Sequence, residues 1–329
     1  MDLVTGGAGF IGQHLVRALT ARGRAVRVLD LAEAPHREPA GPKPADPAPV
    51  DWQRGSLLDA NALAAALDGV ERVFHLAAIP HFWCKDKNAH ERTNVIGTQA
   101  LLAAATAARV DCVVHCSTEA VLLPEGAGQL VDGLHAPRLS AMPGPYTRSK
   151  LLAEEAALSA RGLHVVVVNP TAPIGPGDRG LTPPSRMLKD LLAQRYPAYL
   201  ECVLNLVDVR DVAEGHILAA ERGLPGKRYI LGGENIKLSA LLQEIARLSG
   251  KPMPKRRVPP WLALASAFLG TWMADRITGK APAATPEAVR LALAGTSLSS
   301  AEAKQDLGYR PQPLEAALKA ALQDLSEDA

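Results

Sequence analysis

Several features are scarce in this chain of 329 residues, and each absence argues against a class of partner or site. The formal net charge is only +2, from 36 Lys and Arg against 34 Asp and Glu, so no global field attracts nucleic acid. The four cysteines form no CxxC pair, so we expect no metal site and no disulfide framework. The small net charge favours a small-molecule partner. The first residues lack the basic and apolar segments of a signal peptide, which favours a cytoplasmic protein.

No apolar run is long enough to cross a bilayer, which takes about 20 residues. The nearest candidate is the 14-residue run from Trp261 to Ala274, which follows the basic triplet Lys255, Arg256 and Arg257. We expect a buried or substrate-covering helix here, because interfacial helices usually keep a charged face that this run lacks. The alternative is a helix that lies on the surface of an anionic membrane and makes a peripheral contact through residues 261–274.

The residues that are present alternate between two patterns. Apolar residues make up 47% and charged residues 21%, as in an ordinary globular protein. Short β-branched runs alternate with Ala- and Leu-rich stretches, which predicts an α/β fold with a Rossmann-type, doubly wound parallel sheet. The expected strands of the first half are Asp2–Thr5, Ala25–Leu29, Arg72–Leu76, Cys112–Cys116 and Val165–Asn169. The expected helices lie near Ile11–Arg22, Ala60–Ala66, Thr93–Ala108 and Tyr146–Ala160, and Pro35–Pro49 is expected to be a surface loop.

A glycine-rich turn follows the first expected strand and opens a helix. Gly6 permits the tight turn, Gly9 lets backbone amides approach a pyrophosphate, and Gly12 lets the helix pack against the sheet. The amino end of this helix supplies partial positive charge to phosphates. Asp30 lies 18 residues beyond Gly12, where a carboxylate can accept hydrogen bonds from an adenosine ribose. The turn and the acid together predict a dinucleotide site.

The acid also discriminates between the two nicotinamide dinucleotides. A carboxylate at Asp30 repels a ribose 2′-phosphate, and neither Leu31 nor Ala32 offers a guanidinium to compensate. The sequence therefore predicts NAD, with NADP less favoured. Arg37 is the nearby cation that a loop could bring to the phosphate.

A tyrosine and a lysine predict proton-transfer chemistry. Tyr146 and Lys150 are four residues apart on an expected helix, so they share one face, and the ammonium can stabilise a phenolate. Ser117 and Thr118 end the fourth expected strand, where ligands of parallel sheets bind, so a hydroxyl and the phenol can converge on one substrate oxygen. Glu119 is a further acid or base candidate, although a solvated carboxylate at the strand end is the simpler interpretation.

These motifs together resemble the extended short-chain dehydrogenases, also called the epimerase/dehydratase superfamily, over nearly the whole chain. The motifs are the glycine turn, His75-Leu76-Ala77-Ala78, Asn94-Val95, Gly97-Thr98, Ser117-Thr118, Tyr146 through Lys150 and Gly175-Pro176. The resemblance implies that Tyr146 is the catalytic acid and base, that Lys150 lowers its pKa and binds the nicotinamide ribose, and that Thr118 holds the substrate oxygen. It also implies that Asn94 supports a proton-relay water, and that a homodimer forms through the helices after Thr93 and Tyr146.

The resemblance also assigns a set of residues to the cofactor. They are Gly6, Gly9, Phe10, Ile11, Gly12, Asp30, Ser56, Leu57, Leu76, Ala77, Ala78, Ser117, Tyr146, Lys150, Pro170 and Thr171. One departure is Ser56, where relatives usually carry an aspartate toward the adenine amine. Proline and glycine crowd the chain after Pro170, and the strand pattern later returns. We therefore expect an NAD-binding domain of residues 1–170 plus about 205–233, and a smaller, mainly helical substrate lobe of about 171–204 and 234–329.

The substrate follows from what the chain does not offer to a sugar diphosphate. Asn169 and Ala172 stand where nucleotide-sugar enzymes usually present an Arg and an Asn, and Leu204 stands where they place a later Arg. The chain is instead similar to hopanoid-associated epimerase-like proteins, 3β-hydroxysteroid dehydrogenases and dihydroflavonol reductases. This likeness and the apolar run from Trp261 favour NAD-linked interconversion of a lipophilic secondary alcohol and ketone. The alternatives are a nucleotide-sugar epimerase or dehydratase with tightly bound NAD, and a non-catalytic NAD-binding protein.

Overall fold

The computed structural model describes residues 1–33, 49–124 and 129–327. Its centre is a seven-stranded sheet in which every neighbouring pair of strands is parallel. The strand order is β11-β7-β5-β4-β1-β2-β3. The bounds are β1 Asp2–Thr5, β2 Val26–Asp30, β3 Val50–Arg54, β4 Arg72–His75, β5 Cys112–Cys116, β7 His164–Pro170 and β11 Arg228–Leu231. The prediction of a doubly wound parallel sheet is confirmed.

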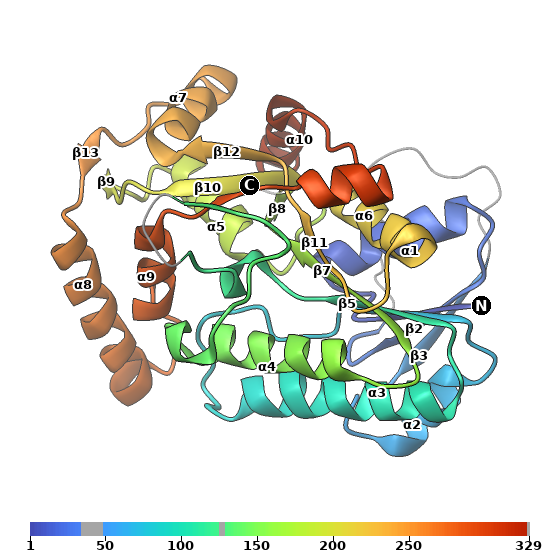
Figure 1. Ribbon diagram of the computed structural model, residues 1–329. Coiled ribbons are helices and arrows are strands. Elements are labelled where there is room, and N and C mark those ends of the chain that lie inside the picture. Colours follow the sequence, from blue (N-terminus) through green and yellow to red (C-terminus); the bar gives the residue numbers. More distant parts are fainter. Residues whose placement is uncertain (34–48, 125–128, 328–329) are drawn as a thin grey trace.

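Helices cover both faces of this sheet (Figure 1). One layer holds α1 (Phe10–Ala21) and α6 (Val209–Arg222), and the other holds α2 (Ala60–Leu67), α3 (Gly97–Ala107) and α4 (Pro145–Ser159). Successive strand residues point to opposite faces, so Val4 and Val114 pack toward α1 and α6 while Leu3 and Val113 pack toward α2 and α3. Because both faces are covered, these strands read as continuous apolar runs in the sequence.

The edge strand β3 was missed by sequence reasoning. Its residues Val50–Arg54 are half-buried or exposed, and they include Asp51, Gln53 and Arg54. An edge strand that is covered incompletely needs no continuous apolar run, so it lacks the signal that identified its neighbours. The loop predicted for Pro35–Pro49 lies, except for Pro49, outside the described residues.

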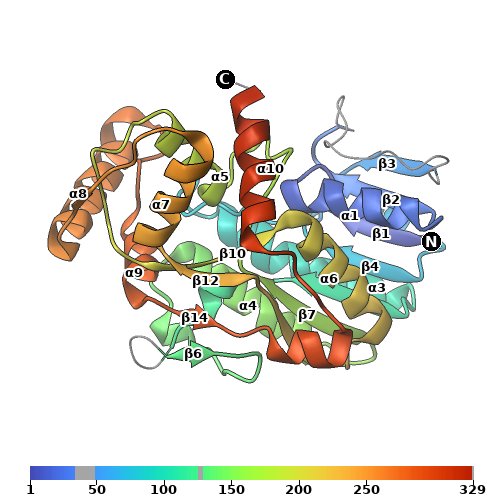
Figure 2. The same cartoon turned by 90° about the horizontal axis from the view of Figure 1, so that it is seen from above.

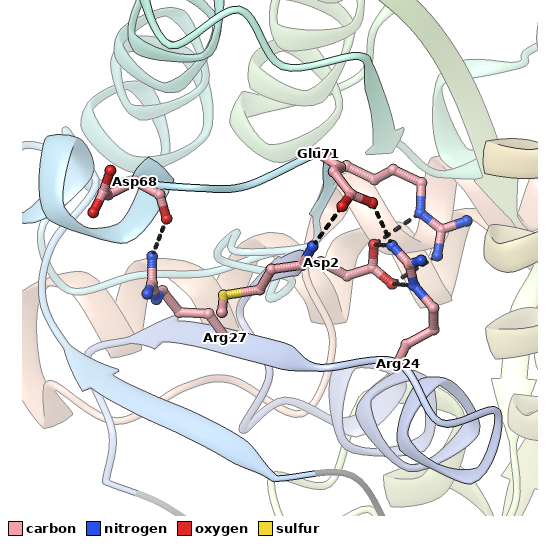
Figure 3. A network of polar contacts seen from close by, with 7 residues as sticks. Asp2, Arg24, Arg27, Asp68 and Glu71 are labelled. Atoms are coloured by element: carbon pink, nitrogen blue, oxygen red, sulfur yellow. Dashed lines mark hydrogen bonds and ion pairs between the residues drawn. The ribbon is translucent and has the colours of Figure 1, made fainter.

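A polar network joins the amino ends of the central strands (Figure 3). Asp2 is fully buried and accepts hydrogen bonds from Arg24, at 2.9 and 3.0 Å, and from Arg72, at 2.6 and 2.8 Å. Burial opposes ionisation, but these two guanidinium groups outweigh it and lower the pKa of Asp2. Glu71 joins the network through Arg24 and the terminal amine of Met1. The bonds hold β1, β2 and β4 in register.

A smaller assembly of helices and short strands lies beside the sheet (Figure 2). A three-stranded sheet of β8 (Ala172–Ile174), β10 (Val203–Asp208) and β12 (Glu234–Lys237) packs with α5 (Pro183–Leu192), α7 (Leu238–Ser249) and α10 (Leu314–Glu327) around one apolar core. The remaining helices are α8 (Pro260–Met273) and α9 (Pro286–Ala294). The remaining short elements are β6 Leu130–Val131, β9 Ala198–Tyr199, β13 Arg256–Arg257, β14 Ser297–Leu298, η1 Glu91–Ile96, η2 Glu119–Val121, η3 Leu139–Ala141, η4 Ala274–Thr278 and η5 Ala303–Leu307.

The chain returns to the large sheet near its end. Ala303, Leu307 and Tyr309 are buried in the same core as Val4 of β1 and Tyr229 of β11. The core on the α1 and α6 side is therefore built from segments about as far apart in the sequence as the chain allows.

Helix α8 is exposed, so the prediction of a buried or substrate-covering helix at Trp261–Ala274 is wrong. Trp261 is 69% exposed, Leu269 60% and Trp272 56%, and Ala267 is the one buried residue within α8. The helix lies at the outer edge of the molecule and packs on α9 (Figures 1 and 2). Its apolar side chains surround the whole helix, and one neighbour can cover only one side. Within the described ranges, no helix combines the length and the apolar character needed to cross a bilayer.

Candidate active site

A cavity of about 440 Å³ opens at the carboxyl ends of β1, β4, β5 and β7. Brought together on its wall are the sequence-predicted residues Gly6, Gly9, Phe10, Ile11, Gly12, Leu76, Ala78, Ser117, Thr118, Tyr146, Lys150, Pro170 and Thr171. These residues come from four different strands and the helices that follow them. Asp30, Ser56, Leu57, Ala77 and Asn94 do not line this cavity.

The glycine turn forms a cradle that is packed too closely against the backbone to accept side chains at Gly6 and Gly12. Gly6 has φ +74°, and a Cβ built on it would lie 2.7 Å from the backbone N of Ala77. A Cβ on Gly12 would lie 2.1 Å from the backbone O of Gly6. Helix α1 begins directly after Gly9, which has no side chain to cap it, so the first amides of the helix face the cavity mouth. This geometry fits the pyrophosphate of a dinucleotide.

The predicted adenosine contacts lie beside the cradle. The carboxylate of Asp30 accepts hydrogen bonds from the backbone N of Ala8 and of Ala32, each at 3.0 Å. It is thereby fixed at the end of β2, next to the turn. Ser56 accepts from the backbone N of Leu58 at 3.1 Å, and Leu57 is buried against Gly97. Their contact with adenine stays a prediction.

Tyr146 and Thr118 meet in the cavity. The phenol of Tyr146 and the hydroxyl of Thr118 are hydrogen-bonded to one another, and both residues are buried. Burial raises the pKa of Tyr146 well above its ordinary value, the bond to Thr118 lowers it, and the negative charge of Glu119 raises it further. Lys150 lies one turn along α4 and donates from Nζ to the backbone O of Cys116 at 2.7 Å. The phenol, the hydroxyl and the ammonium are therefore assembled around one end of the cavity.

Glu119 is part of this site, where sequence reasoning preferred a solvated carboxylate. It lines the cavity, is half-buried, and its Oε2 accepts a hydrogen bond from Thr118 Oγ1 at 3.1 Å. Burial raises the pKa of Glu119 to about 7. The signal available in the sequence was its place one residue after Thr118, at the carboxyl end of β5.

Asn94 lies behind the site on η1 and is buried. Its Nδ2 donates to Ser149 Oγ at 2.9 Å, and its Oδ1 accepts from the backbone N of Ile79 at 2.8 Å. Asn94 therefore ties the loop after β4 to α4, the helix that carries Tyr146. A role for it in a proton relay stays a prediction.

A buried network that sequence reasoning missed supports Thr118. Asn169 Nδ2 donates to the backbone O of Thr118 at 3.0 Å and to Glu154 Oε2 at 2.9 Å. Glu154 is fully buried and paired with Arg228 of β11. A sequence signal existed in Asn169, a polar residue that ends an otherwise apolar strand.

The other half of the cavity is apolar. Its wall includes Leu123, Pro183, Pro184, Met187, Val203, Leu204, Leu291 and Ala292. Of the described residues that line the cavity, Lys150 is the only one with a cationic side chain, and Glu119 is the only carboxylate. Leu204, which stands where a nucleotide-sugar enzyme would place an arginine, faces this space.

A parallel doubly wound sheet, a glycine cradle at the first helix and a buried tyrosine and lysine define a dinucleotide-dependent enzyme of the short-chain dehydrogenase class. Residues 3–232 match the model of the NAD dependent epimerase/dehydratase family. The chain belongs to this family. The predictions of the superfamily, of an enzyme and of NAD as its cofactor are thereby confirmed.

Relatives match over nearly the whole chain. A putative dihydroflavonol 4-reductase of Synechocystis sp. is 37% identical over 324 residues, covering 96% of this chain and 91% of the relative. Sterol demethylase protein B of Methylococcus capsulatus is 32% identical, covering 96% and 95%. The crystal structure of gox2253 has a TM-score of 0.82 at 34% identity and covers 100% of this chain and 98% of that protein.

Proposed function

We propose that the protein is an NAD-dependent oxidoreductase that interconverts a secondary alcohol and a ketone on a lipophilic, steroid-, terpenoid- or lipid-like substrate. The observation that carries the proposal is the apolar cavity wall directly beside Tyr146 and Thr118. The names of two relatives support it, since one is named for a sterol and the other as a dihydroflavonol reductase. An apolar wall with a few convergent polar groups suits a hydrophobic ligand held by one oxygen.

Thr118, Tyr146, Lys150 and Asn94 have different roles in the proposed reaction. NAD, when bound, supplies the hydride acceptor or donor. Thr118 and Tyr146 bind the substrate oxygen from two sides, and Tyr146 removes the hydroxyl proton during oxidation or returns it during reduction. Lys150 holds positive charge on the same face of α4 and binds the nicotinamide ribose. Asn94 fixes the loop after β4 to α4 and supports a relay water.

The cofactor residues divide by the part of NAD that each would hold. Gly6, Gly9 and Gly12 with Phe10 and Ile11 would hold the pyrophosphate, Asp30 the adenosine ribose, and Ser56 and Leu57 the adenine. The other residues that would contact the cofactor are Leu76, Ala77, Ala78, Ser117, Tyr146, Lys150, Pro170 and Thr171. Residues 1–170 with about 205–233 form most of the NAD-binding domain, and about 171–204 with 234–329 form most of the substrate lobe; the pairing of β11 with β7 supports this division. Two segments cross it, since β10 pairs within the smaller sheet and residues 303–309 pack in the core of the large one.

The alternative of a nucleotide-sugar epimerase or dehydratase is disfavoured by the cavity wall. A sugar diphosphate carries charges that need cationic or amide partners, and burying it without them is costly. Lys150 is the one cation among the described lining residues, and the proposed reaction already uses it.

The test is the variant Tyr146→Phe, which keeps the ring and removes the proton. NADH absorbance is followed across a panel of sterols, hydroxy lipids and nucleotide sugars. We expect turnover on a lipophilic alcohol to fall by a factor of about 10²–10⁴ or more, with NAD affinity near normal. The control is Tyr199→Phe. Tyr199 belongs to the short strand β9 and does not line the cavity. Retained turnover in Tyr146→Phe refutes the assignment, and conversion of a nucleotide sugar without net NADH supports the alternative.

We also propose that α8 makes the peripheral membrane contact. Its exposed apolar side chains, Trp261, Phe268, Leu269 and Trp272 among them, are flanked in the sequence by the exposed cations Lys255, Arg256, Arg276 and Lys280. Apolar burial and attraction to anionic headgroups act together at such a surface. We expect the protein to sediment with vesicles that contain anionic lipid, and the double variant Trp261→Ser with Trp272→Ser to lose this binding. Leu224→Ser, at an exposed leucine of another face, is the control. Equal binding of all three proteins would exclude α8 as the contact.

The quaternary structure and the compartment complete the proposal. We propose a homodimer through α3 and α4, which lie side by side on one face of the sheet (Figure 1). We propose a cytoplasmic enzyme, in keeping with four cysteines that are all unpaired. Light scattering that gives the mass of a monomer at micromolar concentration would exclude the dimer.

A further inference from the structure

The catalytic helix α4 receives its cap from a distant part of the chain. Glu287 of α9 is buried, and its carboxylate accepts hydrogen bonds from the backbone N of Thr147 at 2.8 Å, from Thr147 Oγ1 at 2.8 Å and from the backbone N of Tyr146 at 3.3 Å. Thr147 and Glu287 are 140 residues apart. Such bonds satisfy the free amides of a first helical turn, which are usually capped by a neighbouring residue.

The amino end of α4 is shaped to admit this carboxylate. Gly144 is the N-cap residue and offers no side chain of its own. A Cβ on Gly144 would lie 2.3 Å from Glu287 Oε2, so any other residue there would push the carboxylate away. The missing side chain of Gly144 therefore leaves the space in which the Glu287 carboxylate caps α4. Its negative charge lies at the positive end of the helix dipole.

Helix α9 also forms part of the substrate wall. Ala288, Leu291 and Ala292 line the apolar half of the cavity, and Ala288 directly follows Glu287. A substrate that displaces Ala288 would also displace the neighbouring Glu287 and, through its hydrogen bonds, the first turn of α4 with Tyr146.

Resting on the function proposed above, we propose that Glu287 is a positioning residue that fixes the phenol of Tyr146 and couples it to the substrate wall. The other titratable side chains around Tyr146 are Lys150 on α4, Glu119 and Cys116 at the end of β5, and His90, whose ring centre lies 6.2 Å from that of Tyr146. Glu287 adds negative charge, which disfavours the phenolate and raises the pKa of Tyr146.

Two variants separate position from charge. Glu287→Gln keeps one oxygen, which can accept from the backbone N and Oγ1 of Thr147, but removes the charge and the 3.3 Å bond to the backbone N of Tyr146. Glu287→Ala removes every one of these bonds as well as the charge. We expect Glu287→Ala to lower kcat by about tenfold, with the Kd for NAD unchanged. We expect Glu287→Gln to keep most of kcat and to shift the pH profile of alcohol oxidation toward lower pH, because the phenol ionises more readily.

The matched control is Glu234, whose Oε1 accepts from the backbone N of Leu314 at 3.0 Å and so caps α10 far from Tyr146. We expect Glu234→Ala to lower the Tm without changing kcat or its pH profile. If Glu287→Ala likewise lowers only the Tm, and Glu287→Gln leaves the pH profile in place, Glu287 is a structural cap and the proposal is overturned.

A substrate-free measurement distinguishes this failure from failure of the proposed function. Tyrosinate absorbance is titrated in the wild type and in Glu287→Gln, each with Tyr146→Phe subtracted, and the fraction of ionised Tyr146 is compared up to the highest pH at which both proteins stay folded, because the pKa of Tyr146 lies well above its ordinary value. An unchanged Tyr146 titration overturns the charge coupling whatever the substrate panel shows. Absence of turnover in the wild type on every alcohol of the panel counts against the proposed function alone.

Discussion

The half-buried carboxyl of Glu119 makes stability depend on pH near neutrality. Its ordinary pKa is 4.5, and burial in the cavity wall raises the pKa to about 7 in the folded chain. The folded state therefore holds the Glu119 proton more tightly than the unfolded state does. Stability from this group is present at low pH, falls as the pH rises through the interval between the two pKa values, and is lost above pH 7.

The size of the effect follows from that interval. Each pH unit between the two pKa values costs the folded state about 1.4 kcal/mol. Between pH 5 and pH 8 the wild type thus loses about 2 kcal/mol of stability that a variant without the titrating group keeps. Glu119→Gln has a side chain of nearly the same volume and no charge. Its free energy of unfolding relative to that of the wild type should therefore rise by that amount from pH 5 to pH 8.

Denaturant unfolding of both proteins at pH 5 and pH 8, in the absence of cofactor, gives their free energies of unfolding. The quantity to compare is the free energy of unfolding of Glu119→Gln minus that of the wild type, at pH 8 and at pH 5. Glu155→Gln, at an exposed carboxylate of α4, removes the same charge and serves as the control with an expected value near zero. If Glu119→Gln gains no more over the wild type at pH 8 than at pH 5, Glu119 is solvated as the simpler sequence interpretation had it, and the reasoning fails.

Three further changes test the cradle, the cofactor choice and the buried network. Gly12→Ala places a Cβ 2.1 Å from the backbone O of Gly6. We therefore expect NAD binding, measured by calorimetry, to weaken by about 1.4 kcal/mol or more, which is a factor of ten in Kd. A near-normal Kd would show that the turn can relax. Asp30→Ser removes the charge that repels a 2′-phosphate, and the ratio of kcat/KM for NADP to that for NAD should rise about tenfold; an unchanged ratio means that Asp30 does not face the ribose. Arg228→Met leaves the buried carboxylate of Glu154 without its cationic partner, although Asn169 still donates to it. Urea unfolding should report a loss of about 3–5 kcal/mol, largely restored when Glu154→Gln is added. No recovery in that double variant would contradict an unpaired charge as the cause.

The sequence carried the half of the site that is encoded locally. The glycine turn lies between a strand and a helix that are adjacent in the chain, and Tyr146 and Lys150 share one helix, so spacing alone placed them. The strands that both helical layers cover were found as apolar runs, and β3 escaped because it is an edge strand with polar residues.

What the sequence could not reveal depends on contacts between distant segments. Glu287 and Tyr146 are 141 residues apart, and nothing near either residue signals that one caps the helix of the other. Glu119 was underrated because its partial burial in the cavity wall depends on the tertiary structure and leaves no local pattern in the sequence. Helix α8 was misjudged because composition reports how apolar a helix is and is silent on whether a neighbour covers it.

The late return of the chain to the large sheet has a consequence for biosynthesis. Ala303, Leu307 and Tyr309 complete the core beneath α1 and α6, so that core still lacks these side chains when most of the polypeptide has left the ribosome. A nascent chain can form the first strands early, but its α1 and α6 face stays open until translation is nearly finished. Premature termination near residue 300 would release a product with exposed apolar surface, a natural client for chaperones and quality-control proteases.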